Sequence, residues 1–230
     1  MPVYERSVPA APAIPAPIKF LPLLVLVFVI VIGGWTGRAI QLAAHSLPAA
    51  PVIETGYISL AFTPEVQYWG QDIARWADPY GLDRNLAATV MQIESCGNPE
   101  AVSPSGAQGL FQVMPFHFAA GEAMRDPDTN AKRGLDYLSL GLESSGGAPG
   151  LALAGYNGGH SIMSALWSNW SAETQRYYYW GSGIYGEVSE SRPAGRAGEG
   201  RETSDTLNEW LNAGGASLCA KARAQLGLMP

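Results

Sequence analysis

Residues 20–37 contain no charged side chain, and this stretch limits what the first part of the chain can form. Within it, residues 23–32 are an unbroken run of Leu, Val, Ile and Phe, so a helix here would have no polar face. The length suits a short transmembrane helix or a long signal-peptide core. We predict an uncleaved anchor, because residues 1–19 are long for a signal-peptide leader and the apolar run exceeds most such cores.

The segments on either side of this span indicate its orientation. Residues 1–19 are rich in proline, which prevents a stable helix, and we expect an extended tail. Arg6 and Lys19 precede the span, whereas Arg38 is the one cation that follows it closely. The positive-inside rule therefore places the tail in the cytoplasm and the rest of the chain outside. Residues 38–56 are expected to form a tether.

Composition excludes some functions for the remaining residues. The chain has 230 residues, of which 47% are hydrophobic and 15% charged, values typical of a globular protein with a sizeable core. The formal net charge is −6 and no basic cluster occurs, which argues against a nucleic-acid-binding protein. Cys96 and Cys219 lack the spacing of a zinc site; they could pair in an oxidising compartment or both stay free.

Residues 57–186 are predicted to form one mainly α domain, because no alternating strand pattern of useful length appears. A first helix should begin at Thr63, with Pro64 at its first position and Glu65 in its first turn. Its buried stripe is expected to contain Val66, Trp69, Ile73, Trp76 and Tyr80. Further helices are predicted over residues 83–94, 116–124, 126–138, 149–156 and 173–180.

Residues 187–205 carry no aromatic side chain and one large aliphatic, Val188, so they are predicted to be a disordered linker. Residues 206–230 are expected to form a C-terminal helical tail, with helical pieces at 207–211 and 219–226. The sequence assigns no role to this tail.

The stretch of residues 83–115 contains the first candidate site. Asp83 is expected to cap a helix that ends near Glu94, because Gly97 favours a left-handed C-cap and Pro99 prevents continuation. A carboxyl group at such a junction is fixed by the helix, and burial would raise its pKa and keep a proton available for donation. From position alone, a solvated glutamate at a helix end is the favoured interpretation of Glu94.

Two further segments suggest chemistry. Residues 106–115, GAQGLFQVMP, place Gln112 inside an apolar strip that can line a sugar-binding groove or form a buried turn. Residues 154–159, AGYNGG, place Tyr156 and Asn157 at the end of an apolar helix, where the tyrosine hydroxyl could orient Glu94. By itself, this second segment is also compatible with a simple helix C-cap.

In combination, these segments resemble the soluble lytic transglycosylase family, with matching order and spacing across residues 82–185. The resemblance rests on Glu94-Ser95, Asn98-Pro99, Ala101-Val102-Ser103-Pro104, Gly106-Ala107, Gly109-Leu110, Gln112, Met114-Pro115, Asn130, Gly134, Tyr137-Leu138, Ala152-Leu153-Ala154, Tyr156-Asn157, Gly159, Glu173-Thr174-Gln175 and Tyr177. It implies a lysozyme-like helical fold, related to goose-type lysozyme, and cleavage of the β-1,4 bond between N-acetylmuramic acid and N-acetylglucosamine in peptidoglycan.

The resemblance also implies roles for individual residues. Glu94 would be the catalytic acid and base, and no metal or cofactor is implied. The substrate-binding residues would be Ser103, Gln112 and Met114 along the glycan groove, with Tyr156 and Asn157 flanking Glu94. The chain departs from the family pattern at Cys96-Gly97, Phe111, His117 and His160-Ser161.

The family's reaction closes a 1,6-anhydro ring on the muramoyl product, and intramolecular attack lessens the need for a second carboxylate. Two other functions stay open on the sequence. One is a lysozyme that hydrolyses the same bond, with Asp126, Asp128 or Asp136 as second carboxylate. The other is a membrane-tethered module that binds the cell wall without cleaving it.

Overall fold

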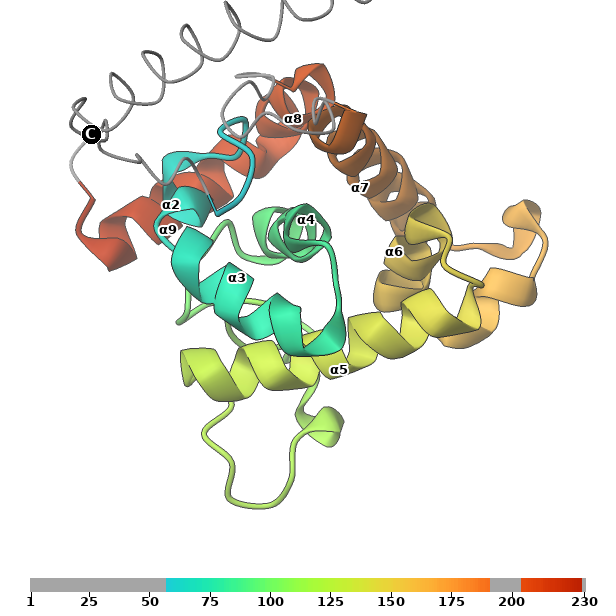
Figure 1. Cartoon of the computed structure of the whole chain (residues 1–230), viewed down its shortest axis with the longest axis horizontal. Helices are drawn as coiled ribbons and strands as arrows, with labels where there is room; N and C mark the ends of the chain where they lie inside the picture. The colour runs from blue at the N-terminus through green and yellow to red at the C-terminus, as the bar shows by residue number, and fades with distance from the viewer. Residues whose placement is uncertain (1–56, 191–203, 229–230) are drawn as a thin grey trace, which may run out of the picture. The chain divides into compact units, whose positions relative to one another are not determined.

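The computed structural model describes residues 57–190 and 204–228, and both ranges belong to one compact unit, Glu54–Pro230 (Figure 1). The predicted cytoplasmic tail, transmembrane anchor and tether, residues 1–56, lie outside the described residues. Among the helices that are described, none is long and apolar enough to cross a membrane.

Helices dominate the described part of the chain, which confirms the mainly α class. The α-helices are α2 (Pro64–Gln67), α3 (Gly70–Ala77), α4 (Arg84–Glu94), α5 (Pro127–Ser144), α6 (Pro149–Gly158), α7 (Ala172–Glu190), α8 (Asp205–Trp210) and α9 (Ala216–Leu226). Short 3-10 helices are η2 (Asp78–Tyr80), η3 (Pro115–His117), η4 (His160–Ser164) and η5 (Trp167–Asn169), and the kinked segment η6 (Leu211–Gly215) joins α8 to α9. Extended pairing in these residues is limited to the isolated bridges of Gln108 with Val102 and Val113.

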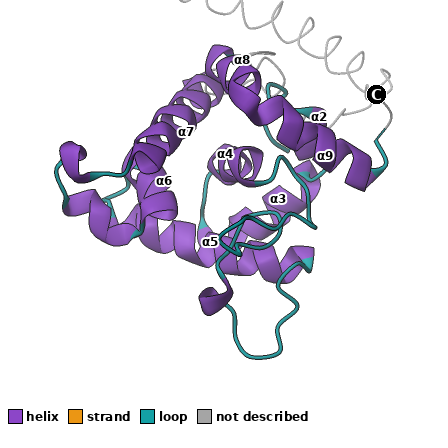
Figure 2. Cartoon of the chain, turned by 180° about the vertical axis from the view of Figure 1, so that it is seen from behind, coloured by secondary structure: helices purple, strands orange, loops and turns teal. Residues whose placement is uncertain are grey.

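Helix α4 lies at the centre of the unit, with the other long helices around it, as Figures 1 and 2 show from opposite sides. As predicted, Asp83 caps its start by accepting a hydrogen bond from the Asn85 amide, 2.7 Å. The sequence predicted one buried face, but all residues from 86 to 92 are buried. The helix can be buried on all sides because several of its side chains are small. Thr89 can be buried because its hydroxyl donates a hydrogen bond to the Asn85 carbonyl within the same helix, at 2.7 Å.

The predicted first helix is divided into α2 and α3, because Trp69 leaves the helical conformation (φ −91°, ψ 4°). The expected stripe is nevertheless buried, except that Tyr80 is only partly buried. The Trp69 indole donates to the Gly97 carbonyl, 2.8 Å, and its ring stacks on Trp76 at 5.9 Å. These contacts hold α3 against the end of α4.

Two helices extend further than the sequence suggested, and one predicted helix is absent. Helix α5 continues to Ser144, and α7 continues to Glu190, into the predicted linker. Burial of Ile184 and Val188 stabilises the end of α7 against α8, a contribution that local composition does not reveal. The prediction of a helix over 116–124 was wrong: beyond η3, residues 119–121 are exposed and have no apolar face to pack.

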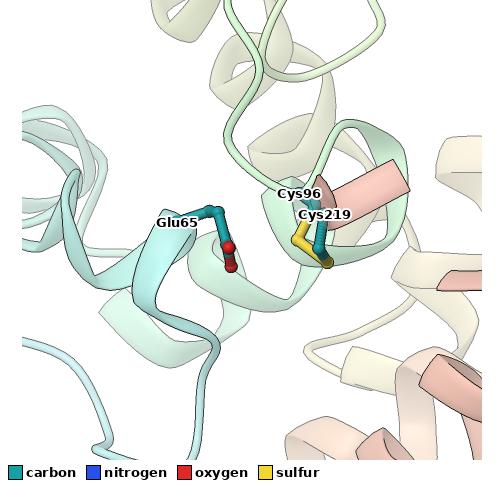
Figure 3. Close-up of side chains that lie close together, drawn as sticks. All are labelled: Glu65, Cys96 and Cys219. Atoms are coloured by element: carbon teal, nitrogen blue, oxygen red, sulfur yellow. A yellow bond between two sulfur atoms is a disulfide. The ribbon is translucent and has the colours of Figure 1, made fainter. Parts of the chain in front are cut away.

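The C-terminal helices are an integral part of the unit. Cys219 on α9 is disulfide-bonded to Cys96, with a Cα–Cα distance of 5.0 Å, which answers the question of pairing (Figure 3). The Arg223 guanidinium donates to the buried carboxylate of Glu65 on α2 at 2.6 Å. Residues 206–228 therefore complete the domain that the sequence ended at residue 186.

Candidate active site

Glu94 is the last residue of α4 and is half-buried. Burial is the main cause that raises the pKa of its carboxyl group to about 8, and the negative charge of Glu173 on α7 contributes in the same direction. The Tyr177 hydroxyl opposes this shift by favouring the charged form. At neutral pH, Glu94 therefore holds a proton that it can donate.

Tyr177 is a site residue to which the sequence assigned no role. It lies on α7 with 6% of its surface exposed, and its hydroxyl interacts with the Glu94 carboxyl. The geometry falls short of a full hydrogen bond, and no other described residue bonds to this hydroxyl. Burial and the charge of Glu94 raise the Tyr177 pKa well above its ordinary value, so the hydroxyl stays a donor.

Tyr156 is brought close to Glu94, as expected. Burial comes first among the causes that raise its pKa well above the ordinary value, and the charge of Glu94 comes second. Its hydroxyl, however, donates to the Phe111 carbonyl at 2.7 Å rather than to the carboxyl. Phe111 and Tyr156 both pack closely against Gly134 of α5. A Cβ atom at Gly134 would lie 2.6 Å from the Phe111 Cβ and 3.0 Å from the Tyr156 hydroxyl.

Asn157 joins two helices. Its side-chain oxygen accepts a hydrogen bond from the hydroxyl of the buried Thr174 at 2.9 Å. This bond connects the end of α6 to the start of α7, where Glu173 lies. Asn157 thus helps to place the first turn of α7 relative to Tyr156.

Ser95 fixes the backbone next to Glu94. Its buried hydroxyl donates to the Leu110 carbonyl at 2.6 Å and accepts from the Gly97 amide at 3.1 Å. The chain then reverses through positive φ angles at Cys96 (51°) and Gly97 (82°). A rigid helix end and a bonded loop therefore hold the carboxyl group from both sides.

The loop that follows contains the three predicted groove residues. Gln112, at a positive φ of 46°, donates to the carbonyls of Ala101 (3.1 Å) and Gly109 (2.9 Å). Ser103 accepts from the Ala107 amide at 3.0 Å, and Met114 is half-buried at the start of η3. Ser103 and Gln112 thus stabilise the loop, and contact of these three residues with sugar stays a prediction.

Asn130 organises the same loop from α5. It is fully buried, and its side-chain oxygen accepts from the Phe111 amide at 2.8 Å. Its amide nitrogen donates to the carbonyls of Gln108 and Met124, both at 2.8 Å. The family motif includes Asn130, but its sequence position gave no hint of these three bonds, because the partners come from two separate segments.

The three aspartates considered as a second carboxylate have other contacts. Asp126 caps α5 through the Thr129 amide, 2.9 Å. The two others accept hydrogen bonds from neighbouring side chains: Asp128 from Trp76 and Arg75, and Asp136 from Tyr80 and Lys132. Glu173 is instead the carboxylate whose charge acts on Glu94.

A second group of buried side chains consists of one carboxylate and two cysteines. Among the described residues, Glu65, Cys96 and Cys219 place one potential metal-ligand atom each within 4.8 Å of the others (Figure 3). Both sulfur atoms belong to the disulfide, so neither is a thiolate ligand.

Known proteins resemble this domain. Residues 71–178, which include Glu94, Gln112, Tyr156 and Tyr177, match the family model described as Transglycosylase SLT domain. A transglycosylase of Enterobacteria phage PRD1 is 35% identical over 114 residues, covering 47% of this chain and 40% of the relative. The membrane-bound lytic murein transglycosylase C of Edwardsiella ictaluri is 26% identical over 167 residues, covering 59% and 46%.

The chain spans less than half the length of these relatives. The lytic transglycosylase Slt of Pseudomonas aeruginosa is a similar solved structure, 24% identical, with 53% of this chain and 24% of that chain covered and a TM-score of 0.43. The match to the Transglycosylase SLT domain model includes Glu94 and the residues around it, so residues 71–178 are similar to this family.

Proposed function

We propose that this protein is a lytic transglycosylase that cleaves the β-1,4 bond between N-acetylmuramic acid and N-acetylglucosamine in peptidoglycan. The observation that carries the proposal is the carboxyl group of Glu94, which is held at the end of α4 with a pKa raised to about 8. Such a group is protonated at neutral pH and becomes a base once it has given up its proton.

In the first step, Glu94 donates its proton to the glycosidic oxygen as the bond from that oxygen to the anomeric carbon breaks. The carbonyl oxygen of the neighbouring N-acetyl group attacks the anomeric carbon and holds the developing positive charge. The Tyr177 hydroxyl favours the carboxylate that Glu94 becomes. Because the substrate supplies this assistance, no second protein carboxylate is required.

In the second step, the Glu94 carboxylate takes the proton of the muramoyl 6-hydroxyl. The freed oxygen attacks the anomeric carbon and displaces the acetamido oxygen, which closes the 1,6-anhydro ring. Glu94 ends the cycle protonated, and no water is consumed. No metal or cofactor has a part in either step.

Hydrolysis of the same bond is the nearest alternative. It would need a second carboxylate near Glu94, and Glu173 is the best candidate because its charge acts on Glu94. Mass spectrometry of sacculi digested by the full chain distinguishes the two reactions. We expect anhydromuramoyl ends. Reducing-end muramic acid without anhydro product would refute the transglycosylase proposal.

The other alternative is a wall-binding module without activity. We expect the Glu94→Gln chain to bind sacculi and to release no soluble fragments, with Glu173→Gln as a matched control that retains most activity. If Glu94→Gln releases fragments at the parent rate, Glu94 is not the catalytic acid.

We further propose that residues 20–37 anchor the protein in the cell membrane and place the catalytic domain outside the cytoplasm, where peptidoglycan lies. Support comes from the uncharged stretch, from the names of the membrane-bound relatives, and from the disulfide, which persists in oxidising compartments. Membrane fractionation, followed by protease digestion from the outer side, tests this. Removal of residues 1–37 should release the domain from the membrane fraction.

A further inference from the structure

A row of aromatic side chains leads away from Tyr156. The ring of Tyr137 on α5 lies 5.6 Å from Tyr156 between centroids, His117 lies 4.7 Å from Tyr137, and Phe116 lies 4.5 Å from His117. Three segments that are distant in sequence, η3, α5 and α6, therefore contribute to one continuous series of rings. The roles proposed above use Tyr156 alone among these four.

The two ends of the row have different surroundings. Tyr156 lies close enough to Glu94 for the carboxylate to raise its pKa, so this end belongs to the catalytic site. Phe116, at the other end, is the most exposed residue of the row, with 76% of its surface accessible. The rings of His117 and Tyr137 that continue from it are half-buried, so Phe116 is not a single scattered apolar residue but the exposed end of a series of ring contacts.

His160 holds the middle of the row in place. Its ring stacks on Tyr137 at 4.1 Å with an interplanar angle of 13°. Room for it depends on Gly141, where a Cβ atom would lie 3.0 Å from the His160 Nε2. The Tyr137 ring thus stacks on His160 and also contacts the ring of His117, with an angle of 49° between the two planes.

The chemistry of the row suits a sugar. A pyranose ring has a face of C–H groups that packs on aromatic rings, while its hydroxyl groups stay in water. Burial lowers the pKa of both His117 and His160, so both rings are uncharged at neutral pH. A sugar that binds on them therefore does not have to displace water from a charged group. A glycan strand cut at Glu94 continues past the broken bond and must lie on the surface beside it.

We propose that Phe116, His117 and Tyr137 form a sugar-binding subsite that receives a pyranose ring of the glycan strand on one side of Glu94. The assignment rests on the proposed function, because the occupant is inferred from continuity with the catalytic site. Tyr137 belongs to the motif shared with the family, whereas His117 and His160 are positions where this chain departs from the family pattern.

Sacculus binding by the full chain carrying Glu94→Gln tests the subsite without turnover. Adding Phe116→Ala should raise the dissociation constant by roughly 2- to 10-fold, the effect of one aromatic contact. Phe116→Trp should restore binding. Tyr68→Ala is the matched control, because Tyr68 is an aromatic side chain that is 54% exposed and contacts only the ring of Trp69 among the described aromatic residues.

The same substitution in the active chain separates binding from chemistry. Phe116→Ala should raise KM for peptidoglycan by a similar factor and leave kcat within about 2-fold, because the ring does not touch the reacting atoms. Unchanged sacculus binding in both Phe116→Ala and His117→Ala would overturn the subsite. The subsite would also be overturned if these substitutions changed self-association of the chain and left sacculus binding intact. That outcome would show that the row of rings is a contact between copies of the chain.

Failure of the subsite and failure of the proposed function give different results. If the parent chain releases no fragments but Phe116→Ala still weakens sacculus binding, the activity is wrong and the subsite stands. If the parent chain releases anhydromuramoyl fragments and both Phe116→Ala and His117→Ala bind and turn over as the parent does, the activity stands and the subsite is wrong.

Discussion

Cys96 follows Glu94 by two residues, and its disulfide to Cys219 connects the end of the central helix to α9 across 123 positions of sequence. The loop that follows Glu94 is therefore tied to α9, the last described helix of the domain. A fragment that stops at residue 186 loses this tie and the Arg223–Glu65 ion pair together.

Replacing both cysteines with serine should destabilise the domain by about 2–5 kcal/mol, because a disulfide that closes a long loop restricts the unfolded chain. Urea unfolding of the parent with and without reductant provides the comparison. The doubly substituted chain is the control, since reductant should not change its midpoint. Equal stability of reduced and oxidised parent would contradict the prediction.

Arg223→Met should destabilise the domain by roughly 2–3 kcal/mol. The substitution leaves the fully buried Glu65 carboxylate without its cation, and the second carboxyl oxygen of Glu65 already lacks a hydrogen-bond partner within the described residues. Buried pairs usually lose about 3–5 kcal/mol, but the Arg223 side chain is 40% exposed, which reduces the effect. Adding Glu65→Gln should recover part of the loss in a double-mutant cycle.

Glu94→Gln should make the domain more stable at pH 8 and change little at pH 4. The folded chain keeps the Glu94 proton up to about pH 8, whereas the unfolded chain releases it near the ordinary pKa of 4.5. Stability from this group is therefore lost as pH rises from about 5 through 8. Glutamine removes that loss, which is on the order of 2–4 kcal/mol. Thermal unfolding at both pH values measures the difference, and a variant less stable than the parent at pH 8 would refute it.

The pH profile of cleavage should show a fall on the alkaline side with an apparent pKa of about 8, as the acid form of Glu94 disappears. In Tyr177→Phe, the hydroxyl that favours the carboxylate is absent, so this fall should move to higher pH. Maximal kcat should also decrease, because the charged form is less stabilised after proton donation. Initial rates from pH 5 to about pH 10 test both effects. A shift to lower pH would exclude this role for Tyr177.

Gly134→Ala should cost about 1–3 kcal/mol of stability and lower activity, since the added methyl group would meet the Phe111 Cβ at 2.6 Å and displace Tyr156. Gly186→Ala is the control: Gly186 also lies in a helix, and an added Cβ there meets nothing within 4 Å. The control should be neutral or slightly stabilising, because alanine favours helix over glycine. Equal effects of the two substitutions would argue against the close packing at Gly134.

The sequence predicted those features that depend on a few neighbouring residues. The cap at Asp83, the end of α4 at Glu94 and the start of α5 after Asp126 all follow from side chains that bond to adjacent backbone groups. The break between α2 and α3 and the extension of α7 to Glu190 could not be predicted in this way. Both depend on buried contacts with segments that are distant in the sequence.

The same distinction applies to the site. Glu94, Tyr156 and Asn157 were identified from motif spacing, and the structure places Tyr156 beside Glu94 while Asn157 bonds to Thr174. The interaction of Tyr177 with Glu94 depends on the packing of α7 against α4, which spacing alone does not define.

For the stretch around Glu94, the sequence by itself determined that a carboxyl group stands where a helix must stop, because Gly97 and Pro99 act locally on the backbone. Only the tertiary structure decided that this group is desolvated, that Tyr177 faces it and that Cys219 anchors the loop beside it. The physical reason is that burial and electrostatic effects depend on distances between elements, and those distances are set by the packing of the whole domain.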